Sequence, residues 1–205
     1  MPVGSGPAGG VAFNRDPIVA LNLKQLRVQR GLTLERLAQT SGLTRSYLSK
    51  VERGISNPSI ESALSIATAL GISVEKLFGH KEEEGDPITI VRSHEGAGKD
   101  PDAYLSLVAG VNPDRTMRAF VVRPGNQSGR GRTTSHHDGE EILYVLKGKI
   151  ELQVGRSVEM LGVGDCVHFN STIPHKLTSV GSVPASALVV VSSVAPKHKP
   201  IKKAA

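Results

Sequence analysis

Polar side chains fill one short stretch of the chain, and their types are those that bind nucleic acid. Arg45 and Lys50 carry positive charge, and Ser46, Tyr47 and Ser49 carry hydroxyl groups. Such groups can donate hydrogen bonds to base edges in the major groove and to phosphate oxygens. They act together only if one local element holds them on a single exposed face.

The residues around this stretch carry the start and stop signals of short helices. Thr33, Thr44 and Ser59 can each cap a helix start with a side-chain oxygen. Glycines, which readily adopt the left-handed conformation, stand where helices should end, at Gly31, Gly42, Gly54 and Gly71. This pattern of N-caps and terminal glycines predicts four short helices.

Apolar residues recur at helical spacing in the same region, so each predicted helix has one side to bury. They are Val19, Leu23 and Leu26, then Leu37 and Ala38, then Leu48 and Val51, then Ile60, Leu64, Ala67 and Leu70. Leu43 is predicted to fill the angle between the second and third helices. The outer face of the third helix is then left to Arg45 and its polar neighbours.

The segment from about Ile18 to Phe78 resembles the helix-turn-helix of the Xre/Cro family of bacterial and phage regulators. The resemblance rests on Leu37-Ala38, on the Leu-Ser-x-x-Glu-x-Gly run at 48–54 and on Asn-Pro-Ser at 57–59. It implies binding to double-stranded DNA. The simpler interpretation is a helical bundle whose exposed helix is merely polar, but agreement at several separate motifs favours DNA binding.

The resemblance implies that the third helix, about Arg45 to Glu52, enters the major groove. The predicted DNA-binding residues are Thr33, Thr44, Arg45, Ser46, Tyr47, Ser49 and Lys50. Arg45, Ser46 and Tyr47, near the helix start, are expected to meet base edges. Thr33, Ser49 and Lys50 are expected to touch phosphates and set the docking angle.

Charge is unevenly distributed along the chain, whose formal net charge is +6. Residues 18–80 carry eight Lys and Arg against four Asp and Glu, whereas residues 81–196 carry twelve against fourteen. Residues 197–205 add four lysines. A positive helical region beside a slightly acidic remainder fits a phosphate-binding surface, although a solvated charged face would give the same count.

The single cysteine, Cys166, excludes an internal disulfide and any site built from several thiolates. The N-terminus lacks a basic start followed by an apolar run, and no run approaches membrane-spanning length. We therefore expect no membrane partner and a location in a reducing bacterial cytoplasm, associated with the nucleoid. Cys166 itself is interpreted as a packing residue.

Composition divides the 205 residues into five parts. Residues 1–15, rich in Gly and Pro, are predicted to be a disordered tail, and residues 196–205 a basic tail. Residues 16–79 form the predicted helix-turn-helix domain and residues 88–195 a second domain. Residues 80–87, which interrupt the apolar pattern, are predicted to be a hinge.

In the second domain the period changes to short runs rich in Val, Ile and Leu, separated by Gly, Pro, Asn and Asp. The runs are 88–92, 104–108, 118–122, 141–146, 149–154, 158–161, 165–169, 175–178 and 187–194. Many short strands predict a sandwich or a barrel. In the run 141–146 both alternating faces look covered, which predicts that one of them packs on a second subunit.

A second resemblance covers about 110 residues of this domain. The spacing Gly129-x5-Ser135-x-His137-x3-Glu141-x6-Gly148, then Gly164-Asp165 and Pro174-His175, is similar to the two motifs of the cupin jelly-roll barrel. The two resemblances imply an α+β multidomain fold, with an N-terminal all-α helix-turn-helix bundle followed by an all-β cupin barrel. Carried over residue by residue, the cupin motifs imply a metal site of His137, Glu141 and His175.

The first histidine of the cupin motif is missing, because Ser135 stands in its place. His136 cannot simply replace it, since in a strand its side chain points to the opposite face. The remaining two imidazoles and one carboxylate match a facial triad, which suits Fe(II), Mn(II), Zn or Ni. The alternative is a hydrogen-bonded polar cluster without a metal, so the sequence requires no cofactor and allows a divalent metal.

The mouth of the barrel is the expected effector pocket under both alternatives. Its predicted lining is Ser135, His137, Glu141 and His175. Arg123, Arg130 and Arg132 flank the loop that leads into it, and a guanidinium can bind a carboxylate or a phosphate. The favoured interpretation of these arginines is nevertheless a Gly-rich surface loop.

Together the resemblances imply a transcription regulator that binds a near-palindromic operator and senses a small-molecule effector. One recognition helix reads few base pairs, so the barrel is expected to hold a homodimer whose recognition helices lie ~34 Å apart. An effector that prefers one arrangement of the paired helices would act through the hinge.

The alternative is a cupin metalloenzyme of the non-haem iron epoxidase or oxygenase type. Hydroxypropylphosphonate epoxidase also joins a helix-turn-helix-like domain to a cupin with two His and one Glu. The complete DNA-binding pattern, and the lack of substrate-positioning residues beyond Tyr104 and the loop arginines, favour a regulator that is not an enzyme. A protein-binding adaptor would explain none of these motifs.

Overall fold

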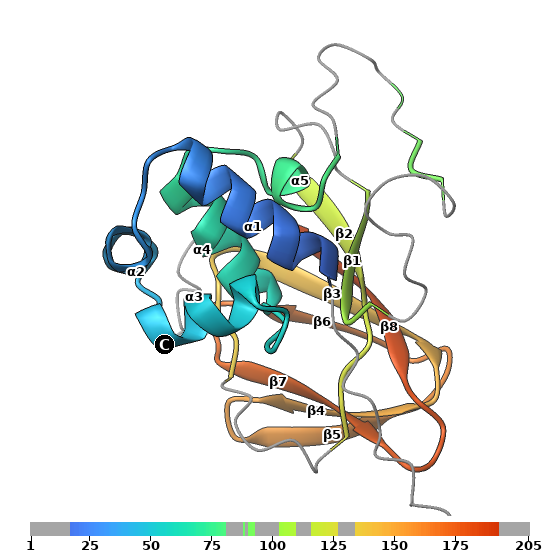
Figure 1. Ribbon diagram of the computed structural model, residues 1–205. Helices are drawn as coiled ribbons and strands as arrows, with labels where there is room; N and C mark the ends of the chain where they lie inside the picture. Colours follow the sequence, from blue (N-terminus) through green and yellow to red (C-terminus); the bar gives the residue numbers. More distant parts are fainter. Residues whose placement is uncertain are drawn as a thin grey trace, which may run out of the picture.

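A cluster of helices lies against a two-sheet β domain in the computed structural model (Figure 1). The structure describes residues 17–80, 88, 90–92, 103–109, 116–126 and 134–192. The predicted tails, 1–15 and 196–205, lie outside the described residues, as does the predicted hinge apart from His80.

The helices begin and end where the caps predict. Thr33, Thr44 and Ser59 each accept a hydrogen bond from the backbone N–H three residues later. Gly42 and Gly71 end their helices with φ of 71° and 61°, values that favour glycine. The helices are α1 (Pro17–Gln29), α2 (Leu34–Ser41), α3 (Arg45–Glu52), α4 (Ile60–Leu70) and α5 (Val74–Leu77).

The fifth helix, α5, is one more than the sequence pattern predicts. It has 4 residues and is capped by Ser73, so it is too short to show helical periodicity. Leu43 packs against the core between α2 and α3, as predicted. Among the described residues, no helix has both the length and the apolar character that crossing a bilayer requires.

The β domain contains two antiparallel sheets. Its strands are β1 (Leu105–Ala109), β2 (Met117–Val122), β3 (Glu140–Lys147), β4 (Lys149–Val154), β5 (Ser157–Leu161), β6 (Cys166–Asn170), β7 (His175–Val180) and β8 (Ser186–Ser192). The larger sheet has the order β1-β2-β8-β3-β6 and the smaller one β5-β4-β7. The fold class is therefore the predicted one, a helical bundle followed by a jelly-roll-like β domain.

Eight of the nine predicted runs correspond to strands, but the run 88–92 does not. Its described residues, 88 and 90–92, belong to no strand. Ile88 and Ile90 are 70% and 64% exposed, so these two apolar side chains are not part of the core. The prediction was wrong because a short apolar run specifies a strand only when a neighbouring strand pairs with it.

Strand β3 places its two alternating faces in different environments. Glu141, Leu143 and Val145 are buried inside the β domain. Ile142, Tyr144 and Leu146, on the other face, are 42%, 43% and 44% exposed. Only one face is thus covered within the chain, and the packing of the other face on a second subunit stays a prediction.

Contacts across the junction join the helices to the larger sheet. The Arg118 Nε on β2 donates to Glu75 Oε1 on α5 at 2.8 Å, and the Glu75 side chain is 0% exposed. Phe78 and Phe120 pack with ring centroids 6.0 Å apart. A buried ion pair broken by removing one partner is costly, so this contact fixes the position of the helices on the sheet.

Candidate functional site

A partly buried ion pair holds α3 against α1. Arg27 donates from Nε to Glu52 Oε1 at 2.6 Å and from Nη2 to Glu52 Oε2 at 3.2 Å. A third bond, from Arg27 Nη1, reaches the Leu32 carbonyl at 2.6 Å. Glu52 is the glutamate of the Leu-Ser-x-x-Glu-x-Gly run, and its bidentate contact sets the orientation of the helix.

The outer face of α3 presents exposed polar side chains. Arg45, Ser46 and Lys50 are exposed, and Ser49 is half-buried. Thr33 and Thr44 are exposed at the starts of α2 and α3, where their oxygens accept the capping hydrogen bonds. Six of the seven predicted DNA-binding residues are therefore brought to one region by the paired helices.

Arg45 is paired across the turn with Glu35 of α2. Their side chains are 65% and 58% exposed, so solvent screens the interaction. A hydrogen bond from the residue's own backbone N–H, with the contribution of Arg45, lowers the pKa of Glu35. The pair orients the guanidinium at the start of α3 without burying it.

Tyr47 is placed differently from the other six residues. It packs against the hydrophobic core and makes hydrogen bonds with the Ser62 side chain and the Ser59 backbone at the start of α4. Burial raises the pKa of Tyr47. The tyrosine thus connects α3 to α4, and base contact by its hydroxyl stays a prediction.

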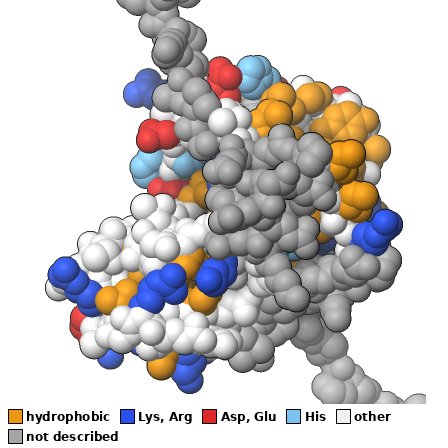
Figure 2. Space-filling model, turned by 90° about the horizontal axis from the view of Figure 1, so that it is seen from above, with side chains coloured by type: hydrophobic (Ala, Val, Ile, Leu, Met, Phe, Trp, Pro, Cys, Tyr) orange, Lys and Arg blue, Asp and Glu red, His pale blue; other side chains and the backbone are white. Residues whose placement is uncertain are grey.

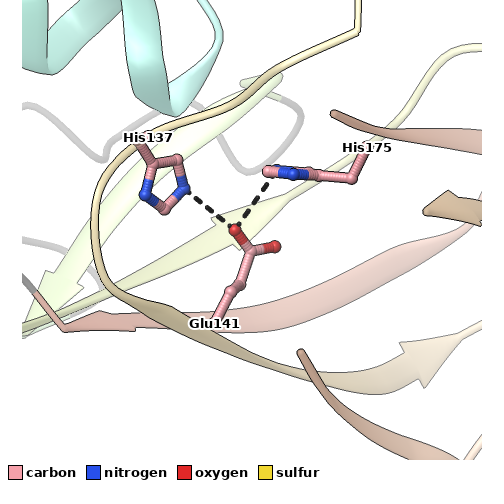
Figure 3. A group of neighbouring side chains, drawn as sticks. All are labelled: His137, Glu141 and His175. Carbon is pink, nitrogen blue, oxygen red and sulfur yellow. Dashed lines mark hydrogen bonds and ion pairs between the residues drawn. The ribbon is translucent and has the colours of Figure 1, made fainter. Parts of the chain in front are cut away.

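A second group of polar residues lies inside the β domain, where Glu141 on β3 sits between two histidines (Figure 3). Glu141 Oε2 is 3.1 Å from His137 Nε2 and 3.4 Å from His175 Nε2. The three ligand atoms all lie within 4.8 Å of one another. This His-Glu-His cluster comes from the loop before β3, from β3 itself and from the start of β7.

Both histidines turn the Nδ1 atom toward a backbone carbonyl. His175 Nδ1 is 2.9 Å from the Ile173 oxygen, and His137 Nδ1 is 3.3 Å from the Asp138 oxygen. If Nδ1–H donates to these carbonyls when a metal is bound, Nε2 carries the lone pair that would bind the metal, which is the usual arrangement of metal-ligating imidazoles. The donor set therefore fits a divalent metal.

Glu141 and its histidine neighbours shift one another's pKa values. Burial raises the pKa of Glu141, but hydrogen bonds from His137 and His175 outweigh burial and leave the pKa below its ordinary value. Burial lowers the pKa of His175, but the hydrogen bond and charge of Glu141 leave it above its ordinary value. Both shifts favour the charged form of the group concerned.

Ser135 occupies the position of the missing cupin histidine and lies at the edge of the cluster. Its backbone pairs with that of His175 through hydrogen bonds of 2.8 and 2.9 Å. The neighbouring His136 is exposed and points to Glu61 of α4 instead, as strand geometry predicts. Ser135 is half-buried, and its Oγ also contacts Glu61, at 3.4 Å.

A hollow of about 520 Å³ opens between the helices and the larger sheet. Its walls include Ser41 of α2, Thr68 of α4, Arg118 of β2 and His137. Of the four predicted effector residues only His137 lines this hollow. This hollow therefore lies at the junction between the domains, and the effector pocket at the barrel mouth stays a prediction.

The three arginines that flank the Gly-rich loop divide into two groups. Arg123 Nη1 donates to the Ala103 carbonyl at 2.9 Å, which ties the arginine to the segment before β1. Arg130 and Arg132 lie outside the described residues.

Cys166 is exposed on β6 rather than packed in the core, so its interpretation as a packing residue was wrong.

Comparison with known proteins agrees with the two halves of the structure. A helix-turn-helix family model matches residues 23–77, and a cupin domain model matches residues 120–191. The HTH-type transcriptional regulator PuuR of Escherichia coli is 28% identical over 163 residues, which are 78% of this chain and 86% of PuuR. The chain is an Xre-type helix-turn-helix regulator with a C-terminal cupin domain.

One solved structure supports the fold of this cupin regulator, and a second one is less similar. An HTH_3 family transcriptional regulator from Vibrio cholerae is 22% identical, with a TM-score of 0.51, over 86% of this chain and 96% of that one. Hydroxypropylphosphonic acid epoxidase from S. wedmorenis is 21% identical, with a TM-score of 0.40, over 87% of this chain and 98% of that one. The second similarity is too low to indicate a shared activity.

Charged residues at the junction between the domains of the regulator were not found from the sequence. Glu61, Glu75 and Arg118 have partners 43 to 75 residues away along the chain. No local pattern marks such contacts, because each partner belongs to a different domain.

Proposed function

We propose that this regulator binds operator DNA with α3 in the major groove. Arg45 and Ser46 contact base edges, while Thr33, Thr44, Ser49 and Lys50 contact phosphates. The observation that carries this proposal is the exposure of Arg45, Ser46 and Lys50 on a helix whose opposite side is fixed to α1 by Glu52. Tyr47 sets the angle between α3 and α4.

The experiment is a fluorescence anisotropy titration of the full chain with DNA from upstream of its own gene. Arg45→Ala is expected to weaken specific binding about 10- to 100-fold, the usual loss for one base-contacting arginine. Arg156→Ala, at an exposed turn of the β domain, is the matched control. Equal affinity of the Arg45→Ala variant and the wild type for every DNA tested would contradict the proposal.

We infer that the regulator is a homodimer paired through the outer face of the larger sheet. Ile142, Tyr144 and Leu146 are exposed there, and Leu188 and Val190 on β8 are half-buried beside them. Figure 2 shows hydrophobic side chains gathered on the side of the molecule away from the helices. A second copy is the favoured occupant, since a two-fold axis through this face would present two α3 helices to a near-palindromic site.

We also propose that the cupin domain responds to a small-molecule effector bound with a divalent metal at His137, Glu141 and His175. The donor set, two imidazole nitrogens and one carboxylate oxygen within 4.8 Å, supports Fe, Mn, Zn or Ni. When bound, such a metal would act as a Lewis acid that coordinates oxygen or nitrogen atoms of an effector. His137 faces both this cluster and the junction hollow, so an effector there would touch both domains.

The regulator is proposed not to be an enzyme. The support is the exposed α3 face and the relation to a named transcriptional regulator. Metal content measured together with gel retardation separates the two functions. Metal without DNA binding would favour the enzyme, and DNA binding that responds to metal or effector would favour the regulator. A location at the bacterial nucleoid follows from DNA binding and stays part of the proposal.

A further inference from the structure

Two polar contacts connect the helical domain to the β domain, one at the start of α4 and one just beyond its end. At the start, Glu61 Oε2 accepts hydrogen bonds from the His136 backbone N–H at 3.1 Å and from Ser135 Oγ at 3.4 Å. Beyond the end, Glu75 of α5 pairs with Arg118 of β2. The 11 residues of α4 make the helix between these contacts about 15 Å long.

The two contacts differ in burial and therefore in strength. The Glu75 side chain is completely buried with its arginine, and removing one partner from such a pair is costly. Glu61 and His136 are 28% and 64% exposed, and their side chains approach at 3.3 Å, from Oε1 to Nδ1. Solvent screens an exposed contact of this kind. The junction thus has one firm contact and one that opens at low cost.

The junction hollow lies between the firm contact and the weak one. Arg118 stands in its wall at the firm contact, and His137, the residue after His136, stands in its wall at the weak one. The middle of α4 lines the hollow with Leu64, Ser65, Ala67 and Thr68. A molecule in the hollow therefore touches α4 between its two attachments, and a change in the width of the hollow acts first on the weaker attachment.

The start of α4 is also attached to α3. Tyr47 makes hydrogen bonds with the Ser62 side chain and the Ser59 backbone, which flank Glu61 in the sequence. One turn of helix thus contacts α3 through two serines and the β domain through Glu61. A change in the position of this turn relative to the β domain carries α3 with it.

We propose that the Glu61 contact is a latch and the Glu75–Arg118 contact a pivot. Release of Glu61 lets the helical domain turn relative to the β domain and changes where α3 is presented. Glu61 is then a positioning residue for DNA binding, an inference that rests on the DNA contact by α3 and the effector response proposed above. An effector that prefers the wider hollow shifts the equilibrium toward the open latch.

The test is a distance measurement between two spin labels by double electron–electron resonance, on the full chain with Cys166→Ser. The labels are attached at Gln25→Cys on α1 and Glu159→Cys on β5, both exposed positions. Dilution with unlabelled chain restricts the signal to distances within one chain. Glu61→Ala is expected to broaden or shift the distance distribution, whereas Glu151→Ala, half-buried on β4, is the matched control and should leave it unchanged.

His136→Ala opens the latch from the β domain and keeps the charge at the start of α4. It removes the contact with Glu61 Oε1 but retains the backbone N–H bond, so its effect on the distances should have the same direction and be smaller. A wild-type distribution equal to that of Glu61→Ala would overturn the latch.

Anisotropy on two DNA duplexes tests the consequence for α3. One duplex has the native half-site spacing, and the other has about five additional base pairs, half a helical turn, between the half-sites. Glu61→Ala should lose less affinity on the longer duplex than the wild type does. An equal loss would overturn the positioning role of Glu61. If the wild type binds neither duplex, the proposed function is wrong, while the spin-label distances still decide whether the latch exists.

Discussion

The outer face of α3 and the His-Glu-His cluster contain similar polar groups but satisfy them in different ways. On α3 the side chains of Ser46 and Lys50 face solvent, and Arg45 does so beside its exposed partner Glu35. In the cluster, Glu141 is 2% exposed and bonded to both histidines. Substitutions on α3 should therefore change DNA binding with little effect on stability, whereas substitutions in the cluster should first change stability.

The largest expected effect comes from separating the two copies of the proposed homodimer. Ile142→Glu places a charge on the outer face of the larger sheet, where Ile142 is 42% exposed. Loss of the dimer removes the avidity of two linked helices, so operator affinity should fall about 10²- to 10⁴-fold. Size-exclusion chromatography with light scattering gives the oligomeric state, and anisotropy gives the affinity.

Val158→Glu is the control for this substitution. Val158 is also apolar and 53% exposed, but it lies on β5 of the smaller sheet. It should leave both the mass and the affinity unchanged. A monomeric wild type, or an Ile142→Glu variant that remains a dimer, would exclude the proposed interface.

The next largest effect is on stability, at the centre of the cluster. Glu141→Ala leaves two histidines without their carboxylate inside the β domain, and should reduce the free energy of unfolding by about 3 kcal/mol. Urea denaturation of the metal-free protein measures the loss. Glu159→Ala, exposed on β5, should change stability by less than ~0.5 kcal/mol. Equal stability of the two variants would show that the cluster is not the buried ionic group described above.

The pH dependence of stability distinguishes the same two regions. The pKa of Glu141 in the folded protein is below its ordinary value of 4.5. The contribution of Glu141 to the free energy of unfolding is therefore fully present above pH 4.5, and it is lost as the pH falls through the folded-state pKa. Because the pKa of His175 is above its ordinary value of 6.5, its contribution is present below pH 6.5 and is lost as the pH rises.

Both contributions are thus complete between pH 4.5 and 6.5, and unfolding of the β domain should require most urea in that window. Glu141→Gln should flatten the profile on both sides, whereas Arg45→Ala should leave it unchanged. A Glu141→Gln profile parallel to that of the wild type would refute the assignment of these shifts to the cluster.

A smaller effect is expected at Lys50, which is exposed on α3. If Lys50 contacts a phosphate, Lys50→Ala should weaken binding to all DNA sequences alike. It should also reduce the salt slope of log affinity by about one. Anisotropy titrations over a series of salt concentrations give the slope. Loss of sequence preference with an unchanged slope would assign Lys50 to base contact instead.

The smallest effect is expected at Glu35, the partner of Arg45. Glu35→Gln removes a negative charge from the DNA-binding face and frees the guanidinium, so operator affinity should rise a few-fold. Stability should change little, because the pair is exposed and solvent screens it. Weaker DNA binding by this variant would mean that Glu35 holds Arg45 in its binding orientation.

The sequence predicts the α3 region well because its determinants are local. Thr44 caps α3 through a bond to the Tyr47 N–H, only three residues away, and Gly42 supplies the left-handed residue before it. What the sequence does not show is that Tyr47 turns toward α4, since that depends on packing against Ser59 and Ser62.

The cluster depends on contacts that no local pattern encodes. Ser135 and His175 are brought together by a bridge between segments forty residues apart, and only the resemblance to cupins implied it. Glu61 meets His136 at a separation of 75 residues, across two domains. The wrong prediction of a strand at 88–92 has the same cause, because a strand forms only beside another strand, which the run itself does not specify.

The most direct test of the account is a hydroxyl-radical footprint of the full chain on its upstream DNA. A dimer that reads DNA with paired α3 helices should protect two stretches related by a two-fold axis, with centres about one helical turn, ~34 Å, apart. Both should be lost together in Arg45→Ala. A single protected stretch, or a footprint that Arg45→Ala leaves intact, would contradict the claim that a dimer reads DNA with paired α3 helices.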